Sequence, residues 1–252
     1  MPLATPALAG KRVAITGASG GIGAACAIAC AAAGAESVAL IARTEPRLRA
    51  VAAGVERAGA DASLHACDVT DTPALVATLD ALGPLDVLVN CAGANQPEQL
   101  LDVQPDTFER LWRLNVQAAF FASQAAARAM VEHRRSGVIV NISSQMGHVG
   151  AALRSVYCTT KHAVEGMTKA MAVELAAWDI RVVSIAPTFT RTGMTEQQLR
   201  DPGTHRRLLA QIPLGRFGEA EDTAAAVVFV SSPGARMLTG SSLIIDGGWT
   251  AK

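Results

Sequence analysis

Segments with the character of buried strands alternate with segments of helical character along most of the chain. The strand-like segments cover residues 11–16, 37–42, 63–67, 85–89, 138–142, 181–185 and, with the turn that follows, 242–248. This alternation predicts an α/β fold, a doubly wound parallel sheet with helices on both faces. Ligands of such sheets bind beyond the carboxyl ends of the strands, so the residues that follow each strand are the first candidates for a functional site.

The composition suits a single domain over residues 1–252 and argues against several kinds of partner. Half of the residues are hydrophobic and only 4% are aromatic, as expected for a sheet covered by closely packed helices. Lys+Arg and Asp+Glu both number 22, and no basic patch predicts binding of nucleic acid. The five cysteines show neither a C-x-x-C pair nor zinc spacing, so we predict reduced thiols and no metal site. The sequence shows no signal-peptide pattern and no apolar stretch that could span a membrane, so we expect a cytoplasmic protein.

A glycine-rich turn with the spacing G-x-x-x-G-x-G follows the first strand and precedes a helix of small residues at 24–33. A strand, a glycine-rich turn and a helix together present backbone N–H groups to a pyrophosphate at the helix N-terminus. Glycine also lets the backbone turn sharply and approach the ligand closely. We therefore predict that a dinucleotide binds at Gly17, Ser19, Gly20, Gly21, Ile22 and Gly23.

The second strand is followed by Arg43 and Thr44, where a carboxylate would bind the ribose of an unphosphorylated dinucleotide. A guanidinium instead pairs well with a 2′-phosphate. The sequence thus favours NADP(H) as the cofactor. NAD(H) is the alternative if Arg43 is only an exposed residue at a strand end.

The third and fourth strands add further candidates at their carboxyl ends. Asp68 can accept a hydrogen bond from an adenine amino group, or it can cap the helix that begins after Asp71. Ala92 and Gly93 leave room for the adenosine ribose, and Asn90 can tie neighbouring strand ends together.

Tyr157, the only tyrosine, and Lys161 lie four residues apart in a helical segment that continues to about residue 178. Residues i and i+4 share a helix face. A cation beside a phenol stabilises the phenolate and lowers the pKa of the phenol, which suits it for proton transfer near neutral pH. The spacing alone is more typical of a buried Tyr and a solvated Lys, and it is the other strand-end residues that favour catalysis.

Residues 105–132 predict one long helix whose apolar side chains spread over more than one face. That breadth favours burial against both the sheet and a second subunit. Asn115 is a poor mid-helix residue, so it either bonds locally and bends the helix or holds a water on a proton path. Residues 193–211 are polar and weakly helical, and we predict a substrate-binding lid there.

Several motifs occur together in an order that resembles the short-chain dehydrogenase/reductase family over essentially the whole chain. They are Thr16-Gly17-x-x-x-Gly21-x-Gly23, Asn90-x-Ala92-Gly93, Asn115, Ser144, Tyr157-x-x-x-Lys161 and Asp246-Gly247-Gly248. Within the family the chain is most similar to 3-oxoacyl-carrier-protein reductase-like and to sugar or polyol dehydrogenase-like members. The resemblance implies a Rossmann-like domain, an oxidoreductase that interconverts a ketone and a secondary alcohol, and a homotetramer.

The resemblance also implies four catalytic residues. Tyr157 would exchange a proton with the substrate oxygen, and Ser144, which fits the family spacing better than Ser143, would hydrogen-bond that oxygen. Lys161 would lower the pKa of Tyr157 and bond the nicotinamide ribose. Asn115 would hold a water between Lys161 and solvent.

Contacts with both ends of the dinucleotide are implied in the same way. Val69 would contact the adenine, and Thr190 and Thr192 would meet the nicotinamide carboxamide. The chain departs from the family at Pro187-Thr188, where Pro-Gly is common, and at Asn90-Cys91, where Asn-Asn is frequent. A side chain at Thr188 changes how the nicotinamide or the substrate is placed.

Five residues that follow strand ends or precede Tyr157 are candidates for substrate contact: Asn95, Gln145, His148, Leu153 and Arg154. Arg154 and His148 can recognise an anionic or hydroxyl-rich substrate. The sequence therefore predicts an NADP(H)-dependent oxidoreductase acting on a small carbonyl or alcohol. The alternatives are an NAD(H)-dependent sugar or polyol dehydrogenase and, from another class, a non-catalytic nucleotide-binding regulator.

Overall fold

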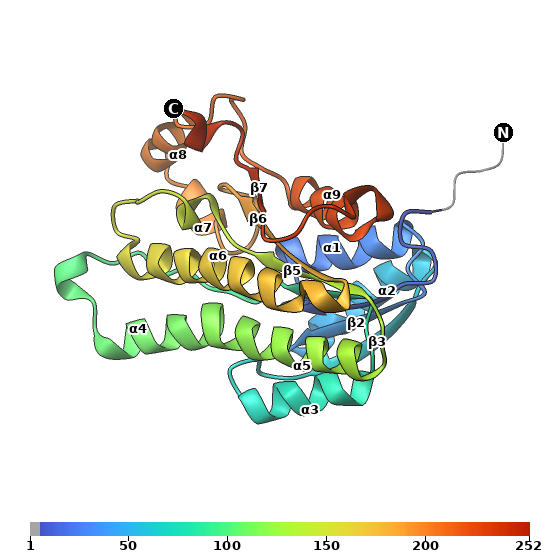
Figure 1. Cartoon of the computed structure of the whole chain (residues 1–252). Coiled ribbons are helices and arrows are strands. Elements are labelled where there is room, and N and C mark those ends of the chain that lie inside the picture. The colour runs from blue at the N-terminus through green and yellow to red at the C-terminus, as the bar shows by residue number, and fades with distance from the viewer. Residues whose placement is uncertain (1–5) are drawn as a thin grey trace.

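A seven-stranded parallel sheet forms the centre of the molecule (Figure 1). The computed structural model describes residues 6–252, without the side chains of residues 197 and 198, so the first five residues of the predicted domain lie outside it. The strand order is β3-β2-β1-β4-β5-β6-β7. The strands are β1 (Arg12–Thr16), β2 (Ser37–Ala42), β3 (Asp61–Ala66), β4 (Val87–Asn90), β5 (Gly137–Ile142), β6 (Ile180–Pro187) and β7 (Ser242–Ile245). The predicted fold class is confirmed.

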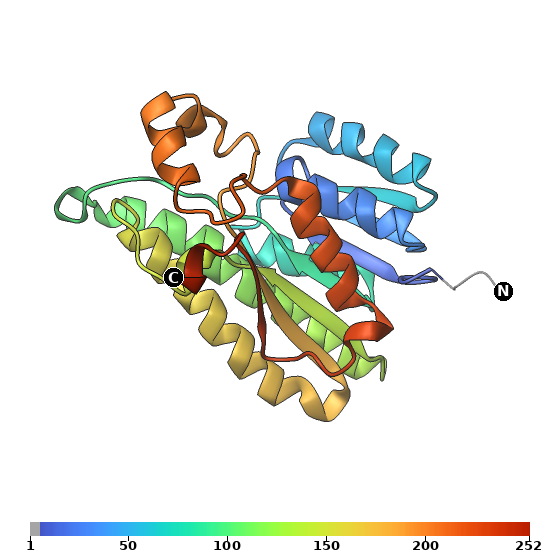
Figure 2. The ribbon, with the colours of Figure 1, turned by 90° about the horizontal axis from the view of Figure 1, so that it is seen from above.

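Helices cover both faces of the sheet, as Figures 1 and 2 show together. One face carries α1 (Gly21–Ala32), α2 (Glu45–Arg57) and α9 (Ala220–Ser231), and the other carries α3 (Thr72–Leu82), α5 (Ala118–Glu132) and α6 (Ser155–Leu175). The central strands are buried on both sides, which explains their continuous runs of Val, Ile and Leu. Cys26 and Cys30 lie fully buried on the inner side of α1.

The strand order reverses between β1 and β4. Chain connections leave these neighbouring strands in opposite directions, which opens a crevice at their carboxyl ends. Thr16 stands opposite Asn90 in the register. The Thr16 hydroxyl accepts the backbone N–H groups of Cys91 at 3.1 Å and Ala92 at 3.3 Å, so the loop after β4 is fastened beside the glycine-rich turn.

The predicted helix over residues 105–132 is present but is not uniform. It consists of α4 (Pro105–Trp112), a five-residue π-helical segment η2 (Arg113–Gln117) and α5. Asn115 lies in the π-helical segment. Such segments insert an extra residue into a helix and are frequent at functional sites.

The segment predicted as a lid forms two short helices, α7 (Glu196–Leu199) and α8 (Pro202–Leu209), beyond the carboxyl end of β6. Figure 2 shows this orange segment standing apart from the layered body of the fold. A small apolar cluster joins it to the body, consisting of Met146, Cys158, Phe189, Leu208, Ile212 and Phe217. The remaining elements are short 3₁₀ turns: η1 (Leu100–Asp102), η3 (Gln145–Gly147), η4 (Ala176–Trp178), η5 (Pro233–Ala235) and η6 (Trp249–Ala251).

Candidate active site

A cavity of about 490 Å³ lies at the carboxyl ends of the strands. It extends from the glycine-rich turn to Tyr157 and Lys161, and its volume is in the range of ordinary cofactor and ligand sites. Eighteen predicted cofactor residues line it: Gly17, Ser19, Gly20, Gly21, Ile22, Gly23, Arg43, Thr44, Asp68, Val69, Ala92, Gly93, Tyr157, Lys161, Pro187, Thr188, Thr190 and Thr192.

The glycine-rich turn fits a dinucleotide because its backbone is packed too closely for side chains. A Cβ atom on Gly23 would lie 2.3 Å from the carbonyl oxygen of Gly17, and one on Gly17 would lie 2.8 Å from Ala92. Gly17 also has a φ of +71°, which disfavours other residues. In the described part of the chain no side chain caps α1 at Gly20, so the N-terminal N–H groups of that helix remain available to an anion.

Positive charge gathers where β2 ends. Arg43 directly follows β2 and Arg47 lies in the first turn of α2, and both line the cavity. Asp68 lies opposite them on the cavity wall, where the backbone N–H of Thr70, its hydroxyl and the charge of Arg43 lower the pKa of the Asp68 carboxyl. Asp68 does not cap the next helix. Asp71 does so by accepting the N–H of Ala74 at 3.1 Å.

Asn90 is the predicted cofactor residue that is not among the described residues lining the cavity. Its side chain points into the fold, where the amide donates at 2.9 Å to both Asn141 and Ser123. It therefore ties β4 to β5 and to α5, as the sequence predicted. A direct contact with the cofactor remains a prediction that this geometry does not support.

Tyr157 and Lys161 project from the first two turns of α6 onto one wall of the cavity. The Lys161 ammonium lies 5.6 Å from the centre of the Tyr157 ring and donates to the carbonyl of Ile142 at 2.9 Å. The Ser144 hydroxyl, at the end of β5, is hydrogen-bonded to the phenol and also accepts the N–H of Met146 at 3.1 Å. A phenol, a hydroxyl and an ammonium therefore converge on one end of the cavity.

The ionisation of the pair differs from the expectation. Burial raises the pKa of Tyr157 to about 12, and the Ser144 hydrogen bond opposes this effect only in part. Burial likewise lowers the pKa of Lys161 to about 8, with Cys91 and then Glu165 opposing the shift. The expected lowering of the phenol pKa is not found in the protein alone, because the burial of Tyr157 outweighs the Ser144 hydrogen bond and the charge of Arg154.

The side chain of Asn115 makes its hydrogen bonds outside its own helix, so the local bonding suggested by its mid-helix position is not found. Its side-chain oxygen accepts the N–H of Ala94 at 2.8 Å, and its amide donates to the Ala94 carbonyl at 2.9 Å and to the Thr160 hydroxyl at 3.1 Å. The side chain thus holds the loop after β4 against α6. The water-holding role implied by the resemblance remains a prediction.

The predicted substrate residues separate into two groups. Asn95 and Gln145 line the cavity, and three of their buried polar atoms have no hydrogen-bond partner among the described residues: Oδ1 of Asn95 and both Oε1 and Nε2 of Gln145. His148, Leu153 and Arg154 are not among the described residues that line the cavity. Leu153 is half-exposed, whereas Arg154 is buried and His148 turns toward α6.

Sequence reasoning missed several cavity residues. Arg47 could have been found, because it is only four residues beyond Arg43 and lies in the first turn of α2. Phe189 belongs to the segment after β6, whose path over the cavity depends on tertiary packing. Met194 and Thr195, which also line the cavity, lie in the segment 193–211 that the sequence predicted as a lid. Within residues 6–252, leaving out side chains 197 and 198, no group of three potential metal ligands is present and no helix is long and apolar enough to cross a membrane.

Residues 11–203 match the family model described as short chain dehydrogenase. The chain is 38% identical to L-xylulose reductase of Mesocricetus auratus over 96% of its own length and 97% of the relative's. A protein of Agrobacterium tumefaciens solved with bound NADP superimposes with a TM-score of 0.92 at 35% identity, over 99% of this chain and 100% of the other. An NAD⁺-bound xylitol dehydrogenase does so with a TM-score of 0.91 at 31% identity, over 96% and 99%.

Proposed function

Since the chain belongs to the short-chain dehydrogenase family and is an NAD(P)-dependent oxidoreductase acting on CH–OH groups, we propose that its substrates are polyhydroxylated ketones and the corresponding polyols. The observation that carries this proposal is the end of the cavity, which Tyr157 and Ser144 line together with the buried side-chain amide of Gln145. Neither the oxygen nor the nitrogen of that amide has a hydrogen-bond partner among the residues that the structure describes. Buried polar groups are stable only when they are hydrogen-bonded. Substrate hydroxyls beside the reacting carbon can supply those bonds.

Tyr157 is proposed to be the proton donor and acceptor, and Ser144 to hold the substrate oxygen at hydrogen-bond distance from it. When bound, the nicotinamide dinucleotide supplies or takes up the hydride. Lys161 in its charged form favours the phenolate of Tyr157, so the two side chains together move a proton to or from the substrate oxygen. Asn115 does not touch Tyr157 or Lys161 directly. It is proposed to help position them, because its amide donates to the hydroxyl of Thr160, the residue before Lys161 on α6.

The cavity can hold the dinucleotide along the strand ends, with the pyrophosphate at the glycine-rich turn. Arg43 and Arg47 favour the 2′-phosphate of NADP(H) over NAD(H). The relatives support both possibilities, since one is described with bound NADP and another with NAD⁺. Asp68 is the only acidic residue among those described along the cavity, which keeps the field there positive.

The names of the relatives support the substrate class, since xylulose and xylitol are polyhydroxylated. The segment 193–211, with α7 and α8, is proposed to close over such a substrate. Its contact with the body is the small cluster around Phe217, and its exposed helices leave it room to move.

Turnover of NADPH and NADH with a panel of ketoses, β-keto esters, diketones and steroids tests the proposal. We expect ketoses to have the highest kcat/KM, and we expect Tyr157→Phe to lower kcat by about 100-fold or more, as loss of a general acid does. Activity on steroids but not on ketoses would overturn the substrate class. A Tyr157→Phe variant as active as the parent would overturn the mechanism.

A groove of about 460 Å³ between α5 and α6 supports an oligomer. It is lined mainly by apolar side chains, including Phe120 and Trp178, while Arg128 on α5 and Glu174 on α6 lie at its polar positions. We propose that this face joins subunits of a homotetramer.

A further inference from the structure

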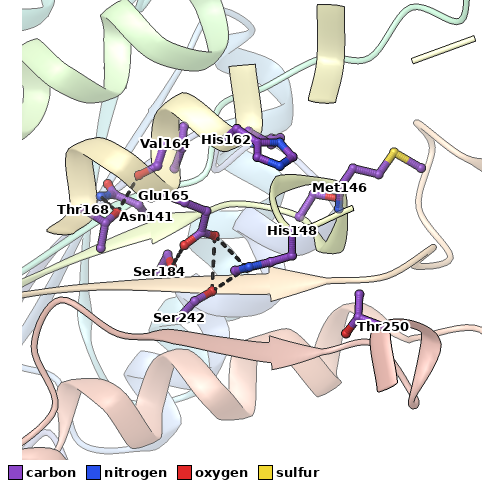
Figure 3. A network of polar contacts seen from close by, with 12 residues as sticks. Asn141, Met146, His148, His162, Val164, Glu165, Thr168, Ser184, Ser242 and Thr250 are labelled. Atoms are coloured by element: carbon purple, nitrogen blue, oxygen red, sulfur yellow. Dashed lines mark hydrogen bonds and ion pairs between the residues drawn. The ribbon is translucent and has the colours of Figure 1, made fainter. Parts of the chain in front are cut away.

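Glu165 lies on α6, one helical turn beyond Lys161, and its carboxylate is almost completely buried. One oxygen accepts the hydroxyl of Ser184 on β6 at 2.7 Å. The other accepts the hydroxyl of Ser242 on β7 at 3.2 Å and lies 3.2 Å from Nε2 of His148. Figure 3 shows the carboxylate enclosed by these three side chains. Removing one partner would leave the buried carboxylate without a hydrogen bond, which is strongly destabilising. The folded protein is therefore expected to keep Ser184, Ser242 and His148 in contact with Glu165.

His148 is a hydrogen-bond donor of the network. Its Nε2 lies 3.0 Å from the Ser242 hydroxyl as well as 3.2 Å from Glu165, so this nitrogen faces two acceptors and carries a proton. Ser242 and Glu165 both contact Nε2 of His148, whereas in a catalytic triad the serine and the acid contact different nitrogens of the histidine ring. The arrangement therefore does not match that of a nucleophilic serine with its base and orienting acid.

The backbone of His148 closes the turn that carries the cavity residues Ser144, Gln145 and Met146. Its N–H donates to the carbonyl of Gln145 at 2.9 Å, and the N–H of Gly147 donates to the carbonyl of Ser144 at 2.8 Å. The turn also touches α6 directly, because a Cβ atom on Gly147 would lie 3.0 Å from the Lys161 carbonyl and 3.1 Å from Cγ of Glu165. His148 and Glu165 thus connect the Ser144 turn to the helix that carries Lys161 and Tyr157.

We propose that Glu165 and His148 are positioning residues, which hold the turn of Ser144 and Gln145 in register with Tyr157. The proposal rests on the proposed function, because it concerns the same reaction. Catalytic groups must be placed to a fraction of an ångström, and an error of about 1 Å costs on the order of 100-fold in rate. The glycine-rich turn and the end of β2, which are proposed to hold the pyrophosphate and the adenosine ribose, lie on other elements. The network is therefore expected to act on the chemical step much more than on the affinity for the dinucleotide.

Steady-state kinetics of His148→Ala and His148→Gln, with NADPH and the ketose that the panel selects, test the proposal. We expect His148→Ala to lower kcat about 10- to 100-fold, as for the loss of a charge-assisted hydrogen bond, while the dissociation constant of NADPH changes less than about twofold. His148→Gln keeps a donor toward the carboxylate and recovers most of the rate. His162→Ala is the matched control, since this histidine lies on the same helix with its ring pointing away from Glu165 (Figure 3).

A second background separates positioning from general stability. In a Ser144→Ala variant the turn no longer presents the hydroxyl that it positions, so His148→Ala should cost less than about threefold there. The proposal would be overturned if His148→Ala lowered kcat equally in the parent and in the Ser144→Ala background. It would also be overturned if His148→Gln were as impaired as His148→Ala, or if the His148 variants bound NADPH more weakly. If Tyr157→Phe abolishes turnover while the His148 variants stay fully active, only the positioning proposal fails. If Tyr157→Phe stays as active as the parent, the proposed function fails, and the positioning proposal that rests on it fails too.

The pH profile of Glu165→Gln gives an independent measurement. The titratable groups around Lys161 are Tyr157 and Glu165 on its own helix, Cys91 on the loop after β4 and, behind Glu165, His148. Glu165 raises the pKa of Lys161 against the effect of burial, so removing its charge should move the alkaline loss of kcat to lower pH. His148→Gln keeps the carboxylate and should not move that loss to lower pH. A Glu165→Gln profile that superimposes on the parent profile would contradict the proposal.

Discussion

Lys161 shows how a single residue can be costly for the fold and useful for the reaction. The side chain is 5% exposed, and burial lowers its pKa from 10.5 to about 8. A lysine with such a pKa is partly neutral in mildly alkaline solution, whereas a solvated lysine is fully charged. The sequence located Lys161 by its spacing from Tyr157, but no local pattern could show that both groups are buried.

The free energy of unfolding should therefore depend on pH through Lys161. Between about pH 8 and 10.5 the unfolded chain binds the proton that folded Lys161 has lost, so the folded state gains stability as pH rises through this window. Relative to Lys161→Met, the parent should gain about 2 kcal/mol between pH 7.5 and 9.5. Urea denaturation at both pH values measures this difference, and a parallel pH dependence of the two proteins would contradict it.

Arg43 and Arg47 allow a second prediction at the scale of the residue. If both guanidiniums bind a 2′-phosphate, each charge reversal should raise the KM for NADPH by about 10- to 100-fold and leave the KM for NADH within about threefold. The variants are Arg43→Glu and Arg47→Glu. The matched control is Arg57→Glu, because Arg57 is the last residue of α2, the helix that carries Arg47. Retained preference for NADPH in both cavity variants would contradict the cofactor assignment.

At the scale of the element, the sequence predicted most helices and strands but not the irregular features that shape the site. The strand at 37–42 has the predicted limits, because it is a continuous apolar run that ends at the polar residues Arg43 and Thr44. α1 begins at Gly21, three residues before the predicted start, since the glycines themselves form its first turn. The π-helical segment at Arg113–Gln117 has no local signature beyond the misplaced polarity of Asn115.

Asn115 should stabilise this element and the loop that it holds. Asn115→Leu keeps the size of the side chain but leaves the Ala94 N–H and carbonyl without their partners, so the free energy of unfolding should fall by about 2–3 kcal/mol. Hydrogen exchange should become faster at Ala94 and its neighbours. Gln117→Leu, which removes one contact to Thr72 in the same segment, serves as the control and should cost about 1 kcal/mol or less. Equal exchange in the two variants would contradict the role assigned to Asn115.

At the scale of the whole molecule, α5 and α6 share an apolar face that is partly exposed. Phe120 and Trp178 are 41% and 50% exposed beside the groove between these helices. Exposed apolar patches of this kind mark interaction surfaces. The sequence predicted a second contact surface from the breadth of the 105–132 pattern, but the contribution of α6 could only come from the fold.

Phe120→Glu should break up the proposed tetramer, because it places a charge in the apolar centre of that face. Light scattering should show a tetramer for the parent at micromolar concentration and a smaller species for the variant. Phe229→Glu is the matched control, since Phe229 is 48% exposed on α9 across the sheet. A monomeric parent, or a variant that stays tetrameric, would contradict the proposal.

Because the thiols of Cys26 and Cys30 are buried, their chemical modification can be used to measure transient opening of the fold. Cys26 and Cys30 face the sheet from α1, and burial raises the pKa of both thiols, so neither forms the reactive thiolate while the layers stay closed. An alkylating reagent can reach them only when α1 lifts away from the strands and from α9. The rate at which the reagent modifies Cys26 and Cys30 therefore measures how often α1, the helix that follows the glycine-rich turn, moves away from the sheet. No added label is needed.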